Sequence, residues 1–256
     1  MKKHFLKGLL IKITSAVSAT VLACSIFTTD AHAATYNIAY SETGTANTEV
    51  SWPDAPEVNS SSCILVDADT GSILFERNSH EKCYPASTTK ILTGLLTIEN
   101  CNMDDVVTFS QAAATSINIY EDANLGCKVG EQFTVNQLLH GLLLYSANEM
   151  AYALGEHVAG SIDAFVDMMN AKAAELGCTN THFNNPNGLP DETHVTTAND
   201  MAKIAKAAWQ NATCRKFFTT DLYEIPPTNV FTETRYLLNH HKMMAGRDYA
   251  YDGVLG

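Results

Sequence analysis

Ser87 and Lys90 are the first residues of this chain whose types and spacing suggest chemistry. They enclose Thr88 and Thr89, follow Pro85, and lead into a run that is apolar at helical spacing. A serine at a helix N-terminus and a lysine one turn later lie on the same face. Lysine can take the serine proton if burial lowers its pKa, and the helix N-terminus favours an oxyanion. A capping serine beside a solvated lysine gives the same pattern, so this motif needs support from elsewhere.

Ser146 and Asn148 form a second polar group, directly after the very apolar residues 142–145. A further helix is expected from Glu149 to Val158, so the group lies at a break between two helices. Taken alone, it is better explained as a helix junction with Ser146 as the N-cap. The position of this group after the first motif favours a catalytic interpretation of both, because Ser-x-Asn begins 59 residues after the serine of Ser-x-x-Lys.

These two motifs in this order resemble those of the penicilloyl-serine transferases, which comprise penicillin-binding proteins and serine β-lactamases. Several flanking segments are similar to D-alanyl-D-alanine carboxypeptidases, and the resemblance runs from about Cys63 to the last residue. The segments that carry it are residues 67–71, 84–90, 181–189, 225–229 and 251–253. The fold implied is α+β, a β-lactamase/transpeptidase-like antiparallel sheet with an inserted helical region.

The resemblance implies a role for each motif residue. Ser87 would attack the carbonyl between two D-alanines of a peptidoglycan stem peptide, with Lys90 as its base. Ser146 would relay a proton to the leaving amine, and Asn148 would hold the substrate amide and orient Lys90. The Ser87 backbone N–H would be one oxyanion-hole donor. No cofactor is implied, and β-lactam antibiotics would acylate Ser87 as covalent inhibitors.

A third family motif, Lys-Thr-Gly, is expected shortly after Asp252-Gly253, but the sequence ends at Gly256. In the family this motif binds the terminal carboxylate of the peptide. We therefore expect a carboxypeptidase truncated before its final strands, inactive as this fragment, whose first hairpin exposes an unpaired edge. Membrane association would then depend on a missing C-terminal segment.

The secondary structure expected around the motifs runs from strands to helices and back to strands. A hairpin is predicted from residues 63–67 and 72–76, joined by a turn that contains Gly71. Thr134 begins a capping box, Ser161 caps a helix that Gly177 ends, and Thr197 begins another helix. Strands return at residues 223–225 and 235–238, which suggests one sheet with an inserted helical region.

The first 33 residues have the composition of a secretory signal peptide. Four lysines precede an apolar stretch from Ile13 to Phe27, and Ala31-His32-Ala33 is a cleavage site. The stretch is shorter than the roughly 20 residues that span a bilayer. We therefore predict a signal peptide over 1–33, a flexible leader over 34–58 and an incomplete catalytic domain over 59–256, at the extracytoplasmic face of a bacterial membrane or secreted.

Charge and cysteine content narrow the class of protein further. The net charge of −12 would become −15 on loss of four lysines and one aspartate, which argues against nucleic-acid binding. Six cysteines would remain after cleavage, and they suit either disulfides in an exported protein or small buried residues. The histidines lack metal-ligand spacing, so no metal site is predicted.

Two other functions compete with a carboxypeptidase. A serine β-lactamase needs a base for fast deacylation, and the loop around Asn185 lacks the Glu-x-x-Leu-Asn sequence that class A enzymes use for it. A non-catalytic penicillin-binding or scaffold protein would fit the missing third motif. The complete set of Ser87, Lys90, Ser146 and Asn148 argues against that second alternative.

Overall fold

The computed structural model describes residues 55–244 together with residues 246, 250 and 254. The predicted signal peptide, most of the predicted leader and the Asp252-Gly253 pair lie outside the described residues. From residue 55 to the first strand the chain has no helix or strand. No helix in the described part is both long and apolar enough to cross a membrane.

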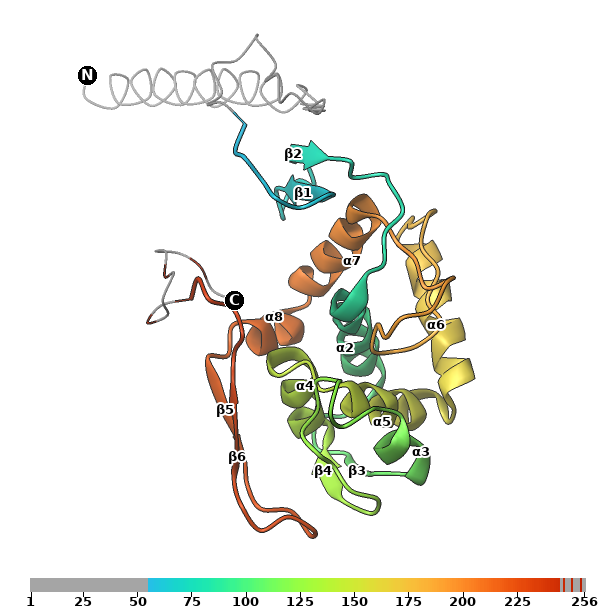
Figure 1. Cartoon of the computed structure of the whole chain (residues 1–256), viewed down its shortest axis with the longest axis vertical. Coiled ribbons are helices and arrows are strands. Elements are labelled where there is room, and N and C mark those ends of the chain that lie inside the picture. Colours follow the sequence, from blue (N-terminus) through green and yellow to red (C-terminus); the bar gives the residue numbers. More distant parts are fainter. Residues whose placement is uncertain (1–54, 245, 247–249, 251–253, 255–256) are drawn as a thin grey trace, which may run out of the picture.

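Helices form the body of the molecule, and three pairs of short strands lie around it (Figure 1). The α-helices are α2 (Thr89–Asn100), α3 (Gln111–Thr115), α4 (Val135–Leu144), α5 (Asn148–Ala159), α6 (Ile162–Glu175), α7 (Ala198–Gln210) and α8 (Ala212–Phe218), and a 3-10 turn η1 (Ala86–Thr88) precedes α2. The strands are β1 (Cys63–Val66), β2 (Ile73–Arg77), β3 (Val106–Thr108), β4 (Gln132–Thr134), β5 (Leu222–Ile225) and β6 (Arg235–Leu238). The α+β class predicted from the sequence is confirmed.

Each strand pairs with one partner in an antiparallel register. The predicted hairpin is confirmed: Cys63 of β1 lies opposite Arg77 of β2, and Gly71 turns the chain at a φ of +79°. The single continuous sheet is not found among the described residues, because β1–β2, β3–β4 and β5–β6 remain separate. The physical reason is their packing: β1 contacts α7 and β6 contacts α4, so the helical body separates the first and last pairs (Figure 1).

Two hydrophobic cores meet at α2, which contributes to one and borders the other. One core joins α4 and α5 to the β3–β4 and β5–β6 pairs through Leu138, Leu142 and Leu154. The second core joins α2 to α6 and α7. Because both cores hold it, α2 is a rigid base for any side chain at its N-terminus.

The helix starts predicted from capping residues are confirmed. Thr134 and Gln137 form both bonds of a capping box at α4, and the Ser161 and Thr197 side chains accept bonds from the first turns of α6 and α7. Gly177 follows α6 in the left-handed conformation. The sequence did not predict the shortest elements, which are α3, α8 and the β3–β4 pair. Segments of three to seven residues carry too little periodicity to be recognised.

The six described cysteines form no disulfide with one another. Three of them are buried and three are half-buried; the buried ones are Cys127, Cys178 and Cys214. Burial raises the pKa of the Cys178 thiol to about 11 and that of Cys214 to about 12. These thiols are therefore protonated near neutral pH and act as small core residues.

Candidate active site

Ser87 lies in the tight turn that joins the chain to α2. Pro85 caps η1, Ala86 adopts a left-handed φ of +48°, and the Thr88 N–H and hydroxyl both donate to the Pro85 carbonyl. An alanine rarely adopts this conformation, so the surrounding structure must hold it there. The turn presents Ser87 just before the first residue of α2, close to the helix N-terminus that the sequence predicted.

The loop of residues 184–189, called here the asparagine loop, packs directly on this turn. Its Gly188 has a φ of +85°, and a Cβ at that position would lie 1.8 Å from the Ala86 carbonyl oxygen. Only glycine allows this approach. The Asn185 side chain closes the loop by accepting from the Gly188 N–H at 2.7 Å and donating to the Leu189 carbonyl at 3.0 Å.

We predict that Gly188→Ala destabilises the protein more than Gly160→Ala. Both glycines have left-handed φ values, +85° and +79°, but nothing lies within 4 Å of a Cβ at residue 160. Left-handed strain costs about 1–2 kcal/mol in each variant. The clash with Ala86 should at least double that cost for Gly188→Ala. Urea unfolding measures both, and equal losses would contradict the close packing of the asparagine loop.

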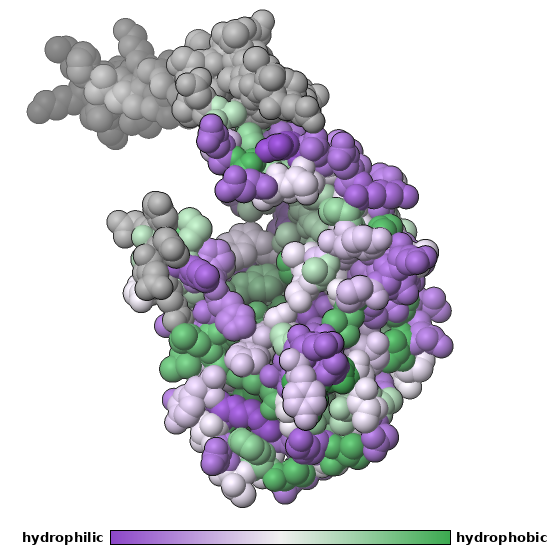
Figure 2. All heavy atoms as spheres, viewed as in Figure 1, coloured by the Kyte–Doolittle hydropathy of each residue, from purple (hydrophilic) through white to green (hydrophobic). Residues whose placement is uncertain are grey.

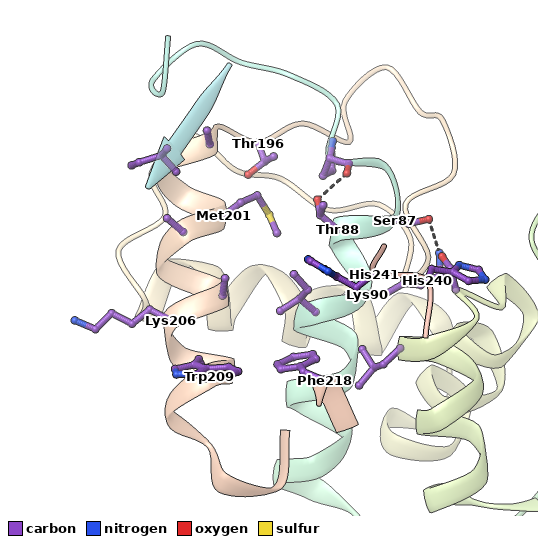
Figure 3. Close-up of a pocket in the computed structure, with 18 of the residues that line it drawn as sticks. Ser87, Thr88, Lys90, Thr196, Met201, Lys206, Trp209, Phe218, His240 and His241 are labelled. Carbon is purple, nitrogen blue, oxygen red and sulfur yellow. Dashed lines mark hydrogen bonds between the residues drawn. The ribbon is translucent and has the colours of Figure 1, made fainter. Parts of the chain in front are cut away.

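Lys90 is the centre of the site. Lys90 is 2% exposed. Its Nζ lies 2.9 Å from Ser87 Oγ, 2.7 Å from Asn148 Oδ1 and 2.7 Å from the Asn187 carbonyl oxygen. The first of these pairs is marked in Figure 3. Ser87 in η1 and Lys90 in the first turn of α2 are three residues apart and so lie side by side, and Asn148 joins them from α5.

Burial changes the protonation of Lys90. Desolvation lowers its pKa from 10.5 to about 8, although the carboxylates of Asp122 and Glu149 act in the opposite direction. A neutral amine has two N–H groups and one lone pair. The Asn187 carbonyl and the Asn148 side-chain oxygen can only accept, so they take both N–H groups. The lone pair then faces the Ser87 hydroxyl, which is the arrangement a general base needs.

Ser146 and Asn148 lie at the break between α4 and α5 that the sequence predicted. Ser146 has a left-handed φ of +61°, and the flanking Ala147 and Asn148 N–H groups bond to the carbonyls of Gly141 and Ala123. Ser146 faces the same cavity as Ser87 and Lys90. Its hydroxyl makes no hydrogen bond to either of them within the described residues. The structure therefore brings all four predicted residues to one place but leaves Ser146 without a contact to the pair.

The asparagine loop supplies a contact that sequence reasoning missed. The sequence predicts a loop here and the segment carries part of the resemblance, but neither indicates a role for Asn187, whose carbonyl accepts from Lys90. Thr93 of α2 donates to the neighbouring Pro186 carbonyl at 2.6 Å and so fixes the loop on the helix. Backbone carbonyls leave no signature in a pattern of side chains, which explains the omission.

A cavity of about 1030 Å³ opens beside Ser87, between β1, α2, α7 and α8. Figure 2 shows this side of the molecule hollowed between the β1–β2 hairpin and the helical body. Figure 3 places Ser87 and Lys90 at one end of the cavity and Trp209 and Phe218 at the other. Its wall is mostly apolar. In the described part of the chain, no group of three or more His, Cys, Asp or Glu side chains is arranged to hold a metal ion.

Fold and site together define a helical α+β protein with a serine–lysine pair at the N-terminus of a central helix. A family model described as D-alanyl-D-alanine carboxypeptidase matches residues 47–254. The chain belongs to this family of serine peptidases.

Relatives of known sequence agree with this assignment. The chain is 39% identical over 168 residues to D-alanyl-D-alanine carboxypeptidase DacF of Bacillus subtilis, covering 64% of this chain and 42% of the relative. It is 32% identical over 203 residues to DacA of Escherichia coli K12, covering 77% of this chain and 48% of the relative. The chain thus spans about half the length of these curated relatives.

Solved structures show the same fold. A D-alanyl-D-alanine carboxypeptidase from Mycobacterium tuberculosis superposes with a TM-score of 0.70 at 32% identity, covering 78% of this chain and 72% of that one. A mutant of the Streptomyces K15 DD-transpeptidase gives a TM-score of 0.72 at 28% identity, with coverage of 79% and 80%.

Proposed function

We propose that the whole protein is a serine D-Ala-D-Ala carboxypeptidase that removes the terminal D-alanine of peptidoglycan stem peptides. The observation that carries the proposal is the buried Lys90, whose Nζ lies within hydrogen-bond distance of Ser87 Oγ, the Asn148 side-chain oxygen and the Asn187 carbonyl. Membership of the carboxypeptidase family supports the substrate class. It also favours this function over a serine β-lactamase.

The proposed reaction has two stages. Ser87 Oγ attacks the carbonyl carbon of the penultimate D-alanine as its proton passes to Lys90 Nζ, and a tetrahedral intermediate forms. The C–N bond then breaks, the amine of the terminal D-alanine takes a proton from Lys90, and an acyl-serine ester remains. Water attacks the ester carbonyl as its proton passes to Lys90 Nζ; the bond between the carbonyl carbon and Ser87 Oγ then breaks, and Lys90 returns the proton to Ser87.

Ser146 and Asn148 complete the proposed roles. Ser146 faces the cavity and is the proposed relay between Lys90 and the leaving amine. Asn148 orients Lys90 through its side-chain oxygen, and its amide nitrogen is the proposed donor to the substrate peptide. The Ser87 N–H, at the N-terminus of α2, is the proposed oxyanion donor.

Export and membrane association also belong to this proposal. The basic and apolar first 33 residues support a cleaved signal peptide, followed by a leader up to residue 58 and the catalytic domain. The protein would then meet its polymer substrate outside the cytoplasm, where β-lactams would also reach Ser87. We propose attachment at the outer face of the cell membrane or secretion.

A single assay on the full-length protein tests the proposed function. The protein is incubated separately with a fluorescent penicillin and with a peptide that ends in D-Ala-D-Ala. We expect stable labelling and release of D-alanine, both lost in Ser87→Ala. Rapid loss of the label would instead indicate a β-lactamase, and labelling without D-alanine release would indicate a non-catalytic penicillin-binding protein. Labelling that survives Ser87→Ala would refute the assigned nucleophile.

A further inference from the structure

His194 is buried beside the nucleophile turn, and nothing in the proposed reaction uses it. It is 2% exposed, and its ring packs edge-on against the buried Phe183, with 5.4 Å between the ring centroids. Its Nε2 lies 2.9 Å from Thr89 Oγ1, and its Nδ1 lies 3.1 Å from the Asn184 backbone nitrogen. The histidine therefore connects the first residue of α2 with the first residue of the asparagine loop.

The two contacts determine which ring nitrogen carries the proton. A backbone N–H can only donate, so Nδ1 must accept from Asn184 and stay unprotonated. A neutral ring then has its proton on Nε2, which donates to the Thr89 hydroxyl. Desolvation lowers the pKa of His194 to about 4; nearby Asp191 opposes this shift and His182 adds to it. The ring is thus neutral over the pH range in which the site would work.

The groups on either side of His194 are those that surround Lys90. Thr89 lies next to Lys90 in α2, and the asparagine loop carries the Asn187 carbonyl that accepts from Lys90. The same loop places Gly188 against the Ala86 carbonyl, beneath the turn that holds Ser87. A shift of this loop away from α2 would remove one acceptor from Lys90 and admit water to it.

The base of the loop is held independently of His194. His182 and Val195 exchange two backbone hydrogen bonds, and so do Cys83 and Thr196. The asparagine loop itself is attached to α2 by the Lys90 bond to the Asn187 carbonyl, the Thr93 bond to the Pro186 carbonyl, and the bridge from Thr89 through His194 to Asn184. Loss of the histidine would therefore release the start of the loop at Asn184 from α2, leaving the Lys90 and Thr93 bonds to hold Asn187, and would leave the paired segments beside the loop in place.

We propose that His194 is a positioning residue that holds the asparagine loop on the start of α2 and thereby keeps the Asn187 carbonyl on Lys90. This inference rests on the proposed function for its catalytic meaning, because Lys90 is the proposed base. The claim that His194 holds the loop on α2 can be tested without any catalytic turnover. The histidine acts through the loop and the helix and contacts no reacting atom.

The first test measures the ionisation of Lys90 without any substrate. The 13Cε resonance of Lys90, assigned through its loss in Lys90→Arg, is titrated in the wild type and in His194→Phe, which keeps a ring but has neither hydrogen bond. Asp122 and Glu149 are unchanged, so a shift reports altered burial of Lys90. We expect the Lys90 pKa to rise from about 8 toward 10.5, and the Asn184 amide to exchange faster with solvent.

His140→Phe is the matched control. His140 is 7% exposed, stacks on Tyr223 at 3.6 Å between centroids, bonds to the Asn136 carbonyl, and is not among the residues that line the cavity. Its replacement should lower thermal stability and leave the Lys90 titration unchanged. A purely structural role for His194 predicts that both variants behave alike.

Thr89→Val provides a second variant if His194→Phe does not fold. It is nearly isosteric and removes only the hydroxyl that His194 bonds. We expect it to shift the Lys90 titration in the same direction, and the double variant to add little to either single change. Additive effects, or a folded His194→Phe with the wild-type titration, would overturn the proposal.

Acylation by a fluorescent penicillin separates this proposal from the proposed function. If Ser87 is the nucleophile, His194→Phe should lower the acylation rate constant by about tenfold to a hundredfold near pH 7 with a smaller change in penicillin affinity, as expected for a displaced base. If the wild type is not labelled at Ser87, the proposed function fails, and the Lys90 titration still decides the role of His194.

Discussion

Replacing Lys90 with arginine is expected to lower the rate constant for acylation of Ser87 by about 10²–10⁴-fold, the usual contribution of a positioned general base. Arginine keeps the positive charge and can still donate to Asn148 and Asn187. Its guanidinium does not lose a proton in proteins, so it has no lone pair to offer Ser87. Stopped-flow or quenched labelling with a fluorescent penicillin measures the rate constant.

The pH dependence of acylation checks the same base in the wild type. A buried lysine whose pKa is lowered to about 8 is charged below that pH and neutral above it. The rate constant should therefore rise with pH and level off above about 8, falling by about a factor of ten per pH unit on the acid side. Lys90→Arg should lose this inflection along with the activity.

Lys216→Met is the control for a change in lysine content. Lys216 lies exposed on α8 and is not among the residues that line the cavity, so its loss should leave the rate constant and the inflection unchanged. A Lys90→Arg variant that acylates at the wild-type rate would show that another group takes the Ser87 proton.

The parts of this site that could be predicted from the sequence are those determined by short-range sequence patterns, such as the helical repeat and the change from apolar to polar residues. Ser87 and Lys90 are one helical turn apart, so their proximity follows from helix geometry once α2 is recognised. The break before Asn148 follows from the change from apolar to polar residues. The meeting of Lys90 and Asn148, 58 residues apart in the chain, was expected only from the family resemblance.

The parts that could not be predicted depend on backbone groups and on contacts distant in sequence. Asn187 contributes a carbonyl that every residue has, and His194 lies 105 residues from Thr89. The pairing of the strands could not be predicted either, because the pattern that indicates a strand does not specify which strands share hydrogen bonds. The motif pattern thus located the proposed nucleophile, while its surroundings required the folded chain.

The largest effect on stability is expected at Glu131, which anchors the β5–β6 pair to the body of the protein. Glu131 is 0% exposed and Arg235 of β6 is 9% exposed, with 2.9 Å between Oε1 and the arginine NH1. Glu131 also accepts from Thr228 and from the Lys128 N–H. The guanidinium lies between the rings of Phe231 and Phe133, at 4.1 and 5.5 Å from their centroids.

Glu131→Gln should cost about 3–5 kcal/mol of unfolding free energy, because it leaves the Arg235 charge buried without its counter-ion. The shape of the side chain is preserved, so lost packing contributes little. Glu175→Gln is the matched control: it removes an ion pair with Lys172 whose glutamate side chain is 66% exposed, and should cost about 0–1 kcal/mol. Urea unfolding measures both.

Adding Arg235→Met to Glu131→Gln tests whether the loss comes from the isolated charge. Methionine fills much of the space between the two phenylalanine rings and carries no charge, so the double variant should recover part of the lost stability. Independent contributions would instead make the double variant less stable than either single one. Because Ser87 and Lys90 are held by α2 and the asparagine loop, a folded double variant should keep the Lys90 titration of the wild type. A stability defect confined to the β5–β6 pair would thus be separable from the chemistry at Ser87.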